Sequence, residues 1–532
     1  MRLLRPLLFL ALLSLSAPLL APGAQAQQAR LIPLGDPVYD TLGRLHRHGL
    51  LLELHPTALP YTEGEVREAL ARLDSARATP RALGWAEQVR RRVGPAPAGA
   101  PGRQRAGLEL AGGTRLATSD RLDPVRFSDA GEPSLQAGAV RVYPQAWLQA
   151  WIAEGPLVAQ FGLRHDVAYN DDPDGLDLVN RLMVRNEEAY VGASGRGGAV
   201  FLGRLAQHWA PPSADAVLLS RHPRPFDGVR YRIGGGRFAI RGLVGELDSV
   251  TEDGRFTGRV GDNDVQEGAI SRLLALHRID WRPRRNIVVS GQEGAVLSGP
   301  VAGFSFPYLL PTLVYAFSID NTPKNVENNG LVGGQLWMQF GPVTVQGQLL
   351  IDDIDLMNAA EQASLALAGT LEAARVLPDV DAGFALTLAT ARTYNTDQPA
   401  GRYVYALRGI GLPETDYVHA RLYADTYLDA LAPGLVVTPE LQVLWQGEAD
   451  LRGEQVPFEG TPLILTGTPE HTLRAGARLY LAPTPHWWLR VDAGLNATRN
   501  AGFAPGAHAT RFVALVEAGA RLRIGGSIPT GW

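Results

Sequence analysis

Few residues in this chain have the spacing that catalysis or metal binding requires. Asn170, Asp172 and Asp174, followed by Gly175, fit the first half of a calcium-binding loop. The position that should supply a bidentate glutamate is Arg181 instead. We therefore interpret this segment as a polar surface loop.

Motifs for hydrolysis are also incomplete. In Gly192-Ala193-Ser194-Gly195 the serine is followed directly by glycine, whereas a nucleophile elbow has one more residue between the two. The segment also lacks the strand-turn-helix setting of that motif. Asp352 and Asp353 are adjacent in a predicted strand, so they would point to opposite faces and would not form a glycosidase pair. His46 and His48 lack the spacing and the glutamate of a zinc protease. We predict that the chain is not an enzyme and has no catalytic residues, no metal and no cofactor.

Composition narrows the possible partners. The chain has no cysteine, which excludes disulfides, thiolate metal sites and cysteine nucleophiles. Its formal net charge of −4 gives no reason to expect nucleic acid as a partner. Lys324 is the only lysine, so the remaining basic charge comes from arginine. Arginines on an inward face can bind carboxylates or phosphates through paired hydrogen bonds.

The N-terminus has the pattern of an export signal. Arg2 and Arg5 precede an apolar run, Leu7–Leu20, and Ala24 and Ala26 form a small-x-small cleavage site. We expect residues 1–26 to be a signal peptide. No later stretch is long and apolar enough to be a transmembrane helix. An exported chain that is rich in strands then fits an outer-membrane protein, because only helices and closed barrels satisfy their backbone in lipid.

Residues 27–93 show helical periodicity and predict a small periplasmic domain of three helices. Thr62 and Glu65 form a capping box, and Thr79-Pro80 opens a third helix. The first two thirds resemble a single S-layer-homology repeat, which implies a grip on peptidoglycan. The alternative is a helical plug or collar packed on the rest of the protein. Residues 94–104, rich in proline, glycine and alanine, are expected to be a linker.

From residue 105 to 532 the period becomes two, as in strands. The clearest hairpin spans Thr472 to Asn496, where apolar and polar residues alternate along both arms. A soluble antiparallel sheet would also show alternating apolar and polar residues, because one of its faces meets a core and the other meets water. Small apolar residues on one face, charged residues on the other and aromatic residues beside the turn, however, favour a wall facing lipid. The apolar residues of the first arm are Leu473, Ala475, Ala477, Leu479 and Leu481, opposite Arg474, Gly476, Arg478 and Tyr480.

Similar runs recur to the end of the chain, where Phe512 to Ile524 alternates with Glu517, Arg521 and Arg523. Together they predict a transmembrane antiparallel β-barrel of about 16 to 18 strands whose lumen is water-filled or plugged. Its connections are unequal. Tight turns such as Thr484-Pro485 contrast with long polar loops, as expected of a barrel inserted from the periplasm. The long loops are residues 170–185, 211–227, 252–266 and 393–401.

The middle of the chain, from about Gly107 to Asp355, contains Gln207-His208-Trp209-Ala210-Pro211, Leu219-Ser220-Arg221, Arg224-Pro225-Phe226-Asp227, His277-Arg278-Ile279-Asp280-Trp281-Arg282-Pro283, Glu293, Leu310-Pro311 and Leu349 to Ile354. In this order these motifs resemble the capsule-assembly Wzi family. The resemblance departs from the common Arg-x-Trp-Gly-Pro motif, because Gln207 and Ala210 replace its arginine and glycine.

The resemblance implies an outer-membrane barrel, blocked as a pore, that acts as a lectin for capsular or exopolysaccharide. Arginine and aromatic side chains would bind an acidic polysaccharide by charge-assisted hydrogen bonds and stacking. The candidate binding residues are Trp209, Arg221, Arg224, His277 and Arg278.

Other partners and functions follow from the same barrel. Outer-membrane lipid and lipopolysaccharide would surround it, and we expect a monomer. Two alternatives stay open: a diffusion porin whose arginines line an eyelet, and a barrel tethered to peptidoglycan by its helical domain.

Overall fold

The structure is a computed structural model that describes residues 29–94, 104–118, 140–167, 184–250, 270–299, 327–353, 364–457, 459–484 and 486–528. The predicted signal peptide, most of the linker, the calcium-loop-like segment and Leu310-Pro311 lie outside these ranges. None of the described helices is long and apolar enough to cross a membrane.

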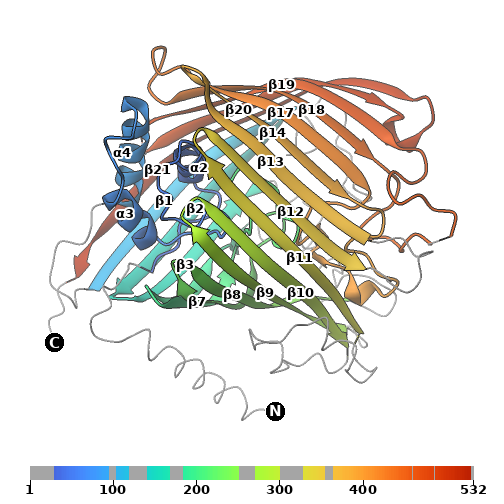
Figure 1. Ribbon diagram of the computed structural model, residues 1–532, viewed down its shortest axis with the longest axis horizontal. Helices are drawn as coiled ribbons and strands as arrows, with labels where there is room; N and C mark the ends of the chain where they lie inside the picture. The colour runs from blue at the N-terminus through green and yellow to red at the C-terminus, as the bar shows by residue number, and fades with distance from the viewer. Residues whose placement is uncertain are drawn as a thin grey trace, which may run out of the picture.

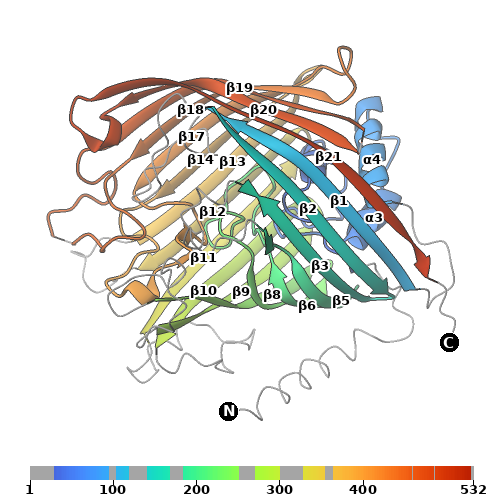
Figure 2. The same ribbon diagram turned by 180° about the vertical axis from the view of Figure 1, so that it is seen from behind.

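The strands form one antiparallel sheet that closes on itself (Figures 1 and 2). The first strand, β1 (Gln104–Ala117), pairs along its length with the last, β21 (His508–Ile528). Two consecutive segments, β4 (Val184–Asn186) and β5 (Ala189–Gly195), both pair with β3 (Leu157–Asp166). They act as one interrupted strand, so the nineteen strands among the described residues form an eighteen-stranded barrel. The predicted antiparallel barrel with N-terminal helices is confirmed.

The other barrel strands follow one another around the wall in chain order. A short hairpin, β15 (Val404–Tyr405) with β16 (Arg408–Gly409), lies in the loop before β17. The remaining strands are β2 (Arg141–Glu154), β6 (Gly198–Leu205), β7 (Phe226–Gly235), β8 (Phe238–Val250), β9 (Ile270–Arg284), β10 (Ile287–Gly299), β11 (Glu327–Phe340), β12 (Val343–Asp353), β13 (Ser364–Leu377), β14 (Val380–Ala389), β17 (Tyr417–Tyr427), β18 (Leu435–Gln446), β19 (Glu470–Thr484) and β20 (Trp487–Arg499).

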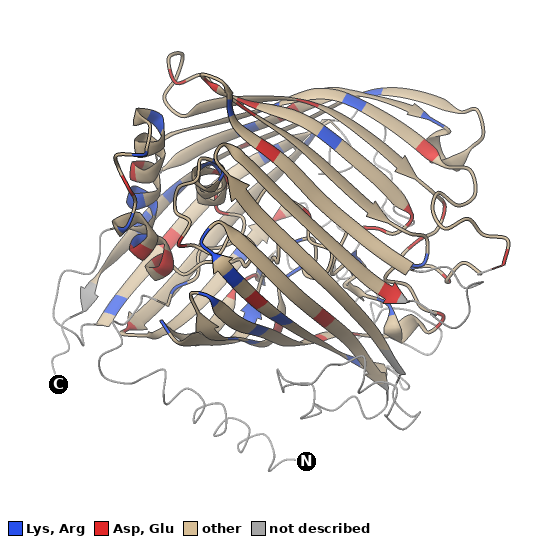
Figure 3. Ribbon diagram, viewed as in Figure 1, with Lys and Arg blue, Asp and Glu red and all other residues tan. Residues whose placement is uncertain are grey.

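The predicted alternation is confirmed in the last three strands. Leu473, Leu495 and Phe512 are 47%, 55% and 59% exposed on the outside of the wall, whereas Arg474 and Asn496 are buried and hydrogen-bonded to each other. This is the arrangement of a barrel with an apolar exterior and a polar interior. Figure 3 shows how sparsely charged residues are distributed along the strands.

Short turns and long loops alternate, as predicted. Residues 196–197, 236–237 and 285–286 connect strands at one end, which we call the turn side. Residues 206–225 and 390–416 connect strands at the opposite end, the loop side.

The N-terminal segment contains three helices, α2 (Val38–Arg47), α3 (Glu63–Ala71) and α4 (Pro80–Val93). Thr62 caps α3 in a complete capping box, and the side chain of Thr79 caps α4, which starts at Pro80. The apolar faces of the helices share one buried core that also includes Tyr427 and Val436 of the barrel wall. The helical segment therefore packs on the wall as a plug.

Ion pairs place this plug at the turn side (Figure 1). Arg81, in α4, contacts Asp379 at 2.7 Å and Asp429 at 2.8 Å, and both carboxylates lie in turns between strands. Deeper in the lumen, Arg47 of α2 contacts Glu372 at 2.9 Å and Asp425 at 2.8 Å. All three of these deeper side chains are largely buried, so they cross-link the plug to the wall.

Two buried histidines make the packing of the plug sensitive to pH. Burial lowers the pKa of His46 to about 4 and that of His55 to about 3, although the nearby Asp280 carboxylate, 3.2 Å from His55 Nε2, opposes the shift of His55. In an unfolded segment both would titrate near pH 6.5. Below about pH 6.5 the unfolded segment binds protons that the folded one excludes, so the stability of the plug falls as the pH drops.

We predict that protection of the plug amides against hydrogen exchange is lower at about pH 5 than at about pH 7.5. A His55→Gln variant should show a smaller difference between the two pH values, because one of the groups that must be kept neutral is gone. Exchange in full-length protein, followed by mass spectrometry, measures this. Equal protection of residues 38–93 at both pH values in the unmodified protein would contradict the prediction.

Candidate functional site

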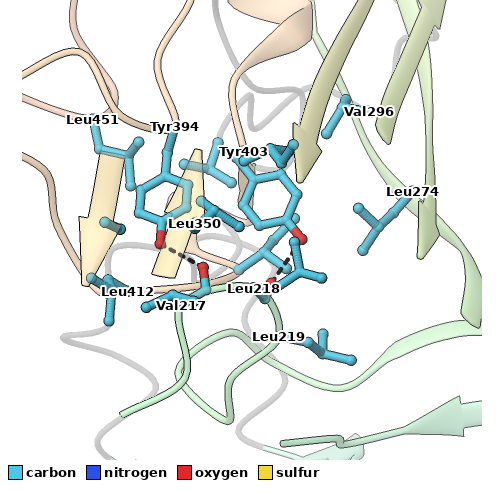
Figure 4. Close-up of a cluster of buried hydrophobic side chains, with 14 of the residues drawn as sticks. Val217, Leu218, Leu219, Leu274, Val296, Leu350, Tyr394, Tyr403, Leu412 and Leu451 are labelled. Carbon is cyan, nitrogen blue, oxygen red and sulfur yellow. Dashed lines mark hydrogen bonds between the residues drawn. The ribbon is translucent and has the colours of Figure 1, made fainter. Parts of the chain in front are cut away.

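One half of the lumen is filled by the loops themselves. The loop of residues 206–225 turns inward and is covered by residues 390–416. Tyr394 donates a hydrogen bond to the carbonyl oxygen of Val217 at 2.5 Å, and Tyr403 donates one to that of Leu218 at 2.7 Å (Figure 4). Both tyrosines belong to a buried hydrophobic cluster that includes Leu350 of β12. This half is a packed core.

The other half contains a polar cavity of about 530 Å³, which we call the luminal cavity. It lies between α2, the inward loop and the wall formed by β17 to β21 and β1. Seven arginines and four carboxylates line it, together with Tyr39, Tyr423 and Tyr480. The positive excess favours an acidic ligand. The arginines are Arg44, Arg47, Arg115, Arg221, Arg421, Arg478 and Arg490, and the carboxylates are Asp40, Asp425, Asp492 and Glu517.

Two smaller cavities adjoin it. A cavity of about 210 Å³ shares Arg421, Arg478 and Asp492 with the luminal cavity. On another side, a cavity of about 290 Å³ shares Arg115 and Arg490. The three form a polar passage along one side of the barrel.

The 290 Å³ cavity carries two tryptophans. The rings of Trp147 and Trp488 lie 6.4 Å apart. The guanidinium of Arg164 lies 5.3 Å from the first ring and that of Arg521 lies 5.6 Å from the second. Aromatic faces beside arginines suit a ligand that has both an apolar ring face and anionic groups.

The arginines of the luminal cavity differ in how far their charge is compensated. Arg421 and Arg478 both contact Glu440, at 3.0 and 3.1 Å. Arg44 instead lies between the rings of Tyr427 and Tyr480, at 5.9 and 5.8 Å.

Arg44 has no carboxylate oxygen within 4 Å of its guanidinium among the described residues. Arg221 donates to the carbonyl oxygen of Pro212 at 3.2 Å. It forms no ion pair with any residue that the structure describes. These two charges are available to a bound anion.

The structure gives Trp209 and Arg278 a buried position. Trp209 is 3% exposed, and the Arg278 guanidinium lies 5.7 Å from its ring. Every guanidinium nitrogen of Arg278 is bonded to protein, to Asp280, Thr57, Ser290 and the Trp209 carbonyl. A ligand could reach Arg278 only by breaking bonds that hold the plug residue Thr57.

The other three predicted residues are dispersed. Arg221 lines the luminal cavity, whereas Arg224 is partly exposed farther along the same loop. His277 precedes the inward-pointing Arg278 in β9, so it faces the outside of the wall, where it lies 3.5 Å from Glu293. Strand alternation therefore places His277 and Arg278 on opposite faces of the wall, and a role of either residue in polysaccharide binding stays a prediction.

Sequence reasoning missed Arg44 and Tyr423 as site residues. Arg478 and Tyr480 had been predicted on the inner face of the hairpin, and that prediction is confirmed. Arg44 was missed because its helix was expected to belong to a separate domain.

The structure also shows where Ser194 and Asp352, from the incomplete hydrolase motifs, are located. Ser194 is buried within strand β5, and the Asp352 carboxylate accepts a hydrogen bond from the Tyr394 backbone N–H.

Comparison with solved structures supports the fold. Wzi of Escherichia coli, described as an outer membrane protein involved in group 1 capsule assembly and a carbohydrate-binding β-barrel, is similar with a TM-score of 0.60 and 10% identity. The match covers 93% of this chain and 99% of Wzi.

More distant matches are OccK3 of Pseudomonas aeruginosa and OccAB4 of Acinetobacter baumannii, with TM-scores of 0.41 and 0.43 and identities of 10% and 8%. Each match covers 79% of this chain. The matches cover 96% of the OccK3 chain and 98% of the OccAB4 chain. No protein-family model and no curated protein matches the sequence. The chain thus has the fold of a Wzi-like outer-membrane barrel.

We predict that Arg278→Met destabilises the protein by about 3–5 kcal/mol, because the buried Asp280 carboxylate loses a partner. Arg221→Gln should change stability by less than about 0.5 kcal/mol, since its side chain is solvated. Urea unfolding of the detergent-solubilised variants measures both. Equal destabilisation by the two substitutions would contradict this division between structural and cavity arginines.

Proposed function

We propose that this outer-membrane barrel binds acidic capsular or exopolysaccharide and holds it at the cell surface, as a member of the Wzi family. The observation that supports this best is the luminal cavity, in which seven arginines outnumber four carboxylates beside three tyrosines. The likeness in fold to a carbohydrate-binding barrel agrees with it.

The binding chemistry follows from the geometry of the cavity. Arg44 and Arg221 offer planar guanidinium groups that can bind a uronate carboxylate or a sugar phosphate through two hydrogen bonds. The Tyr423 and Tyr480 rings hold arginines of the cavity in place, with Arg421 4.5 Å from the Tyr423 ring centre and Arg44 5.8 Å from that of Tyr480. Because the adjoining cavities share lining residues, successive sugars of one chain can occupy neighbouring sites and bind with additive strength.

In this proposal the turn side faces the periplasm, and the plug blocks the lumen there. The apolar exterior contacts outer-membrane lipid and lipopolysaccharide. Contact of residues 29–94 with peptidoglycan, suggested by the S-layer-homology resemblance, stays a prediction.

The binding test uses an acidic and a neutral oligosaccharide of equal length. We predict that Arg44→Gln with Arg221→Gln raises the dissociation constant for a uronate oligosaccharide at least about tenfold, because two charge-assisted contacts are lost. Binding of the neutral oligosaccharide should change little.

Arg77→Gln is the matched control, since the Arg77 side chain is 84% exposed and away from the cavity. Unchanged binding of the acidic oligosaccharide by the double variant would argue against the luminal cavity as its site.

A diffusion channel is the second candidate, because the three adjoining cavities form a polar passage lined by arginines. Recordings in planar bilayers distinguish the two functions. We predict no steady open-channel current from purified protein, since the plug is held by buried ion pairs. Stable conductance steps in the unmodified protein would favour the channel instead.

A further inference from the structure

A second cavity lies at the turn side, apart from the luminal cavity. Its volume is about 630 Å³, and it is bounded by helix α3 and strands β7 to β9. Its rim is formed by Arg196 and Arg237, which lie in short turns, and by Arg284 at the end of β9. Gly236, Arg237 and Arg284 are exposed, so the cavity opens at this end of the barrel.

The lining carries a large positive excess. Nine arginines and four carboxylates surround the cavity. Each carboxylate already contacts an arginine, as in Glu53 with Arg285 at 2.7 Å and Glu65 with Arg232 at 3.3 Å. The remaining arginine charge has no carboxylate to neutralise it within the lining, which favours the entry of anions.

Within the described ranges, two of the inner arginines bond only to neutral groups. Arg230 donates to the Pro60 carbonyl oxygen at 3.3 Å, and its Nη1 atom has no hydrogen-bond partner among the described residues. Arg282 donates through Nη2 to the carbonyl oxygen of Leu52 at 2.6 Å. A buried guanidinium that lacks an anion is costly, so a ligand that supplied negative charge here would be stabilised.

We propose that this turn-side cavity is a second binding site, for a small multivalent anion carrying phosphate or carboxylate groups. Several guanidinium groups converge on one space, and each can grip such a group with two parallel hydrogen bonds. The volume exceeds that of a single phosphate, so the ligand bears several charged groups. The site is independent of the polysaccharide proposal, because the turn-side cavity and the luminal cavity share no lining residue.

Titration calorimetry on the full-length protein in detergent at low ionic strength tests the site, with inorganic tripolyphosphate and citrate as probes. Tighter binding of tripolyphosphate assigns the site to phosphates, and tighter binding of citrate assigns it to carboxylates. Raising the salt concentration should weaken either. If the protein binds neither tripolyphosphate nor citrate, the proposal is overturned.

The key variant is Arg237→Gln with Arg284→Gln, which removes two exposed rim charges and leaves the plug contacts intact. It should raise the dissociation constant of the better probe about tenfold, while Arg77→Gln leaves it unchanged. The double variant and the unmodified protein should bind the uronate oligosaccharide equally well. The experiment therefore tests the turn-side site independently of the polysaccharide site. Probe binding that is unaffected by the double substitution would also overturn the proposal.

Discussion

Buried ion pairs between the N-terminal helices and the barrel wall are the interactions on which the rest of the structure depends. Arg47 faces three carboxylates, Glu372, Asp381 and Asp425, contributed by three different strands. Arg92 of α4 likewise contacts Glu109 of β1. Removing the helices would leave Glu372, Asp381 and Asp425 without the arginine they share, at a cost of several kcal/mol for each uncompensated charge, whereas Glu109 would keep Arg521 of β21 at 3.0 Å. The wall and the plug are therefore one folding unit, although their sequence patterns differ.

This constraint divides the lumen into two environments. On the side of β8 to β14, the inward loop and the covering loop exclude water, and tyrosine hydroxyls satisfy the loop carbonyls. On the side of β17 to β21, α2 leaves a polar space in which arginines are only partly compensated. Of these two halves, the second holds the arginines with donors left for a ligand, because buried and fully bonded arginines such as Arg278 have none.

The sequence predicted the barrel well wherever the inner face meets polar surroundings, as in β19 to β21. It shows little alternation in the strands β10, β11 and β13, because their inner faces carry Val296, Leu331 and Ala366, which pack against the inward loop. Apolar residues on both faces leave no alternation to detect. Arg44 could not be recognised as a site residue for a related reason: its importance comes from two tyrosines that are distant in sequence and come close only when the plug docks.

The most direct test of this account is a cryo-electron microscopy structure of the full-length protein in lipid nanodiscs with a uronate oligosaccharide. We expect sugar density between α2 and the wall of β17 to β21, with a carboxylate beside Arg44 and the helices in place. Density confined to the exterior loops, or a lumen emptied of its helices, would contradict it.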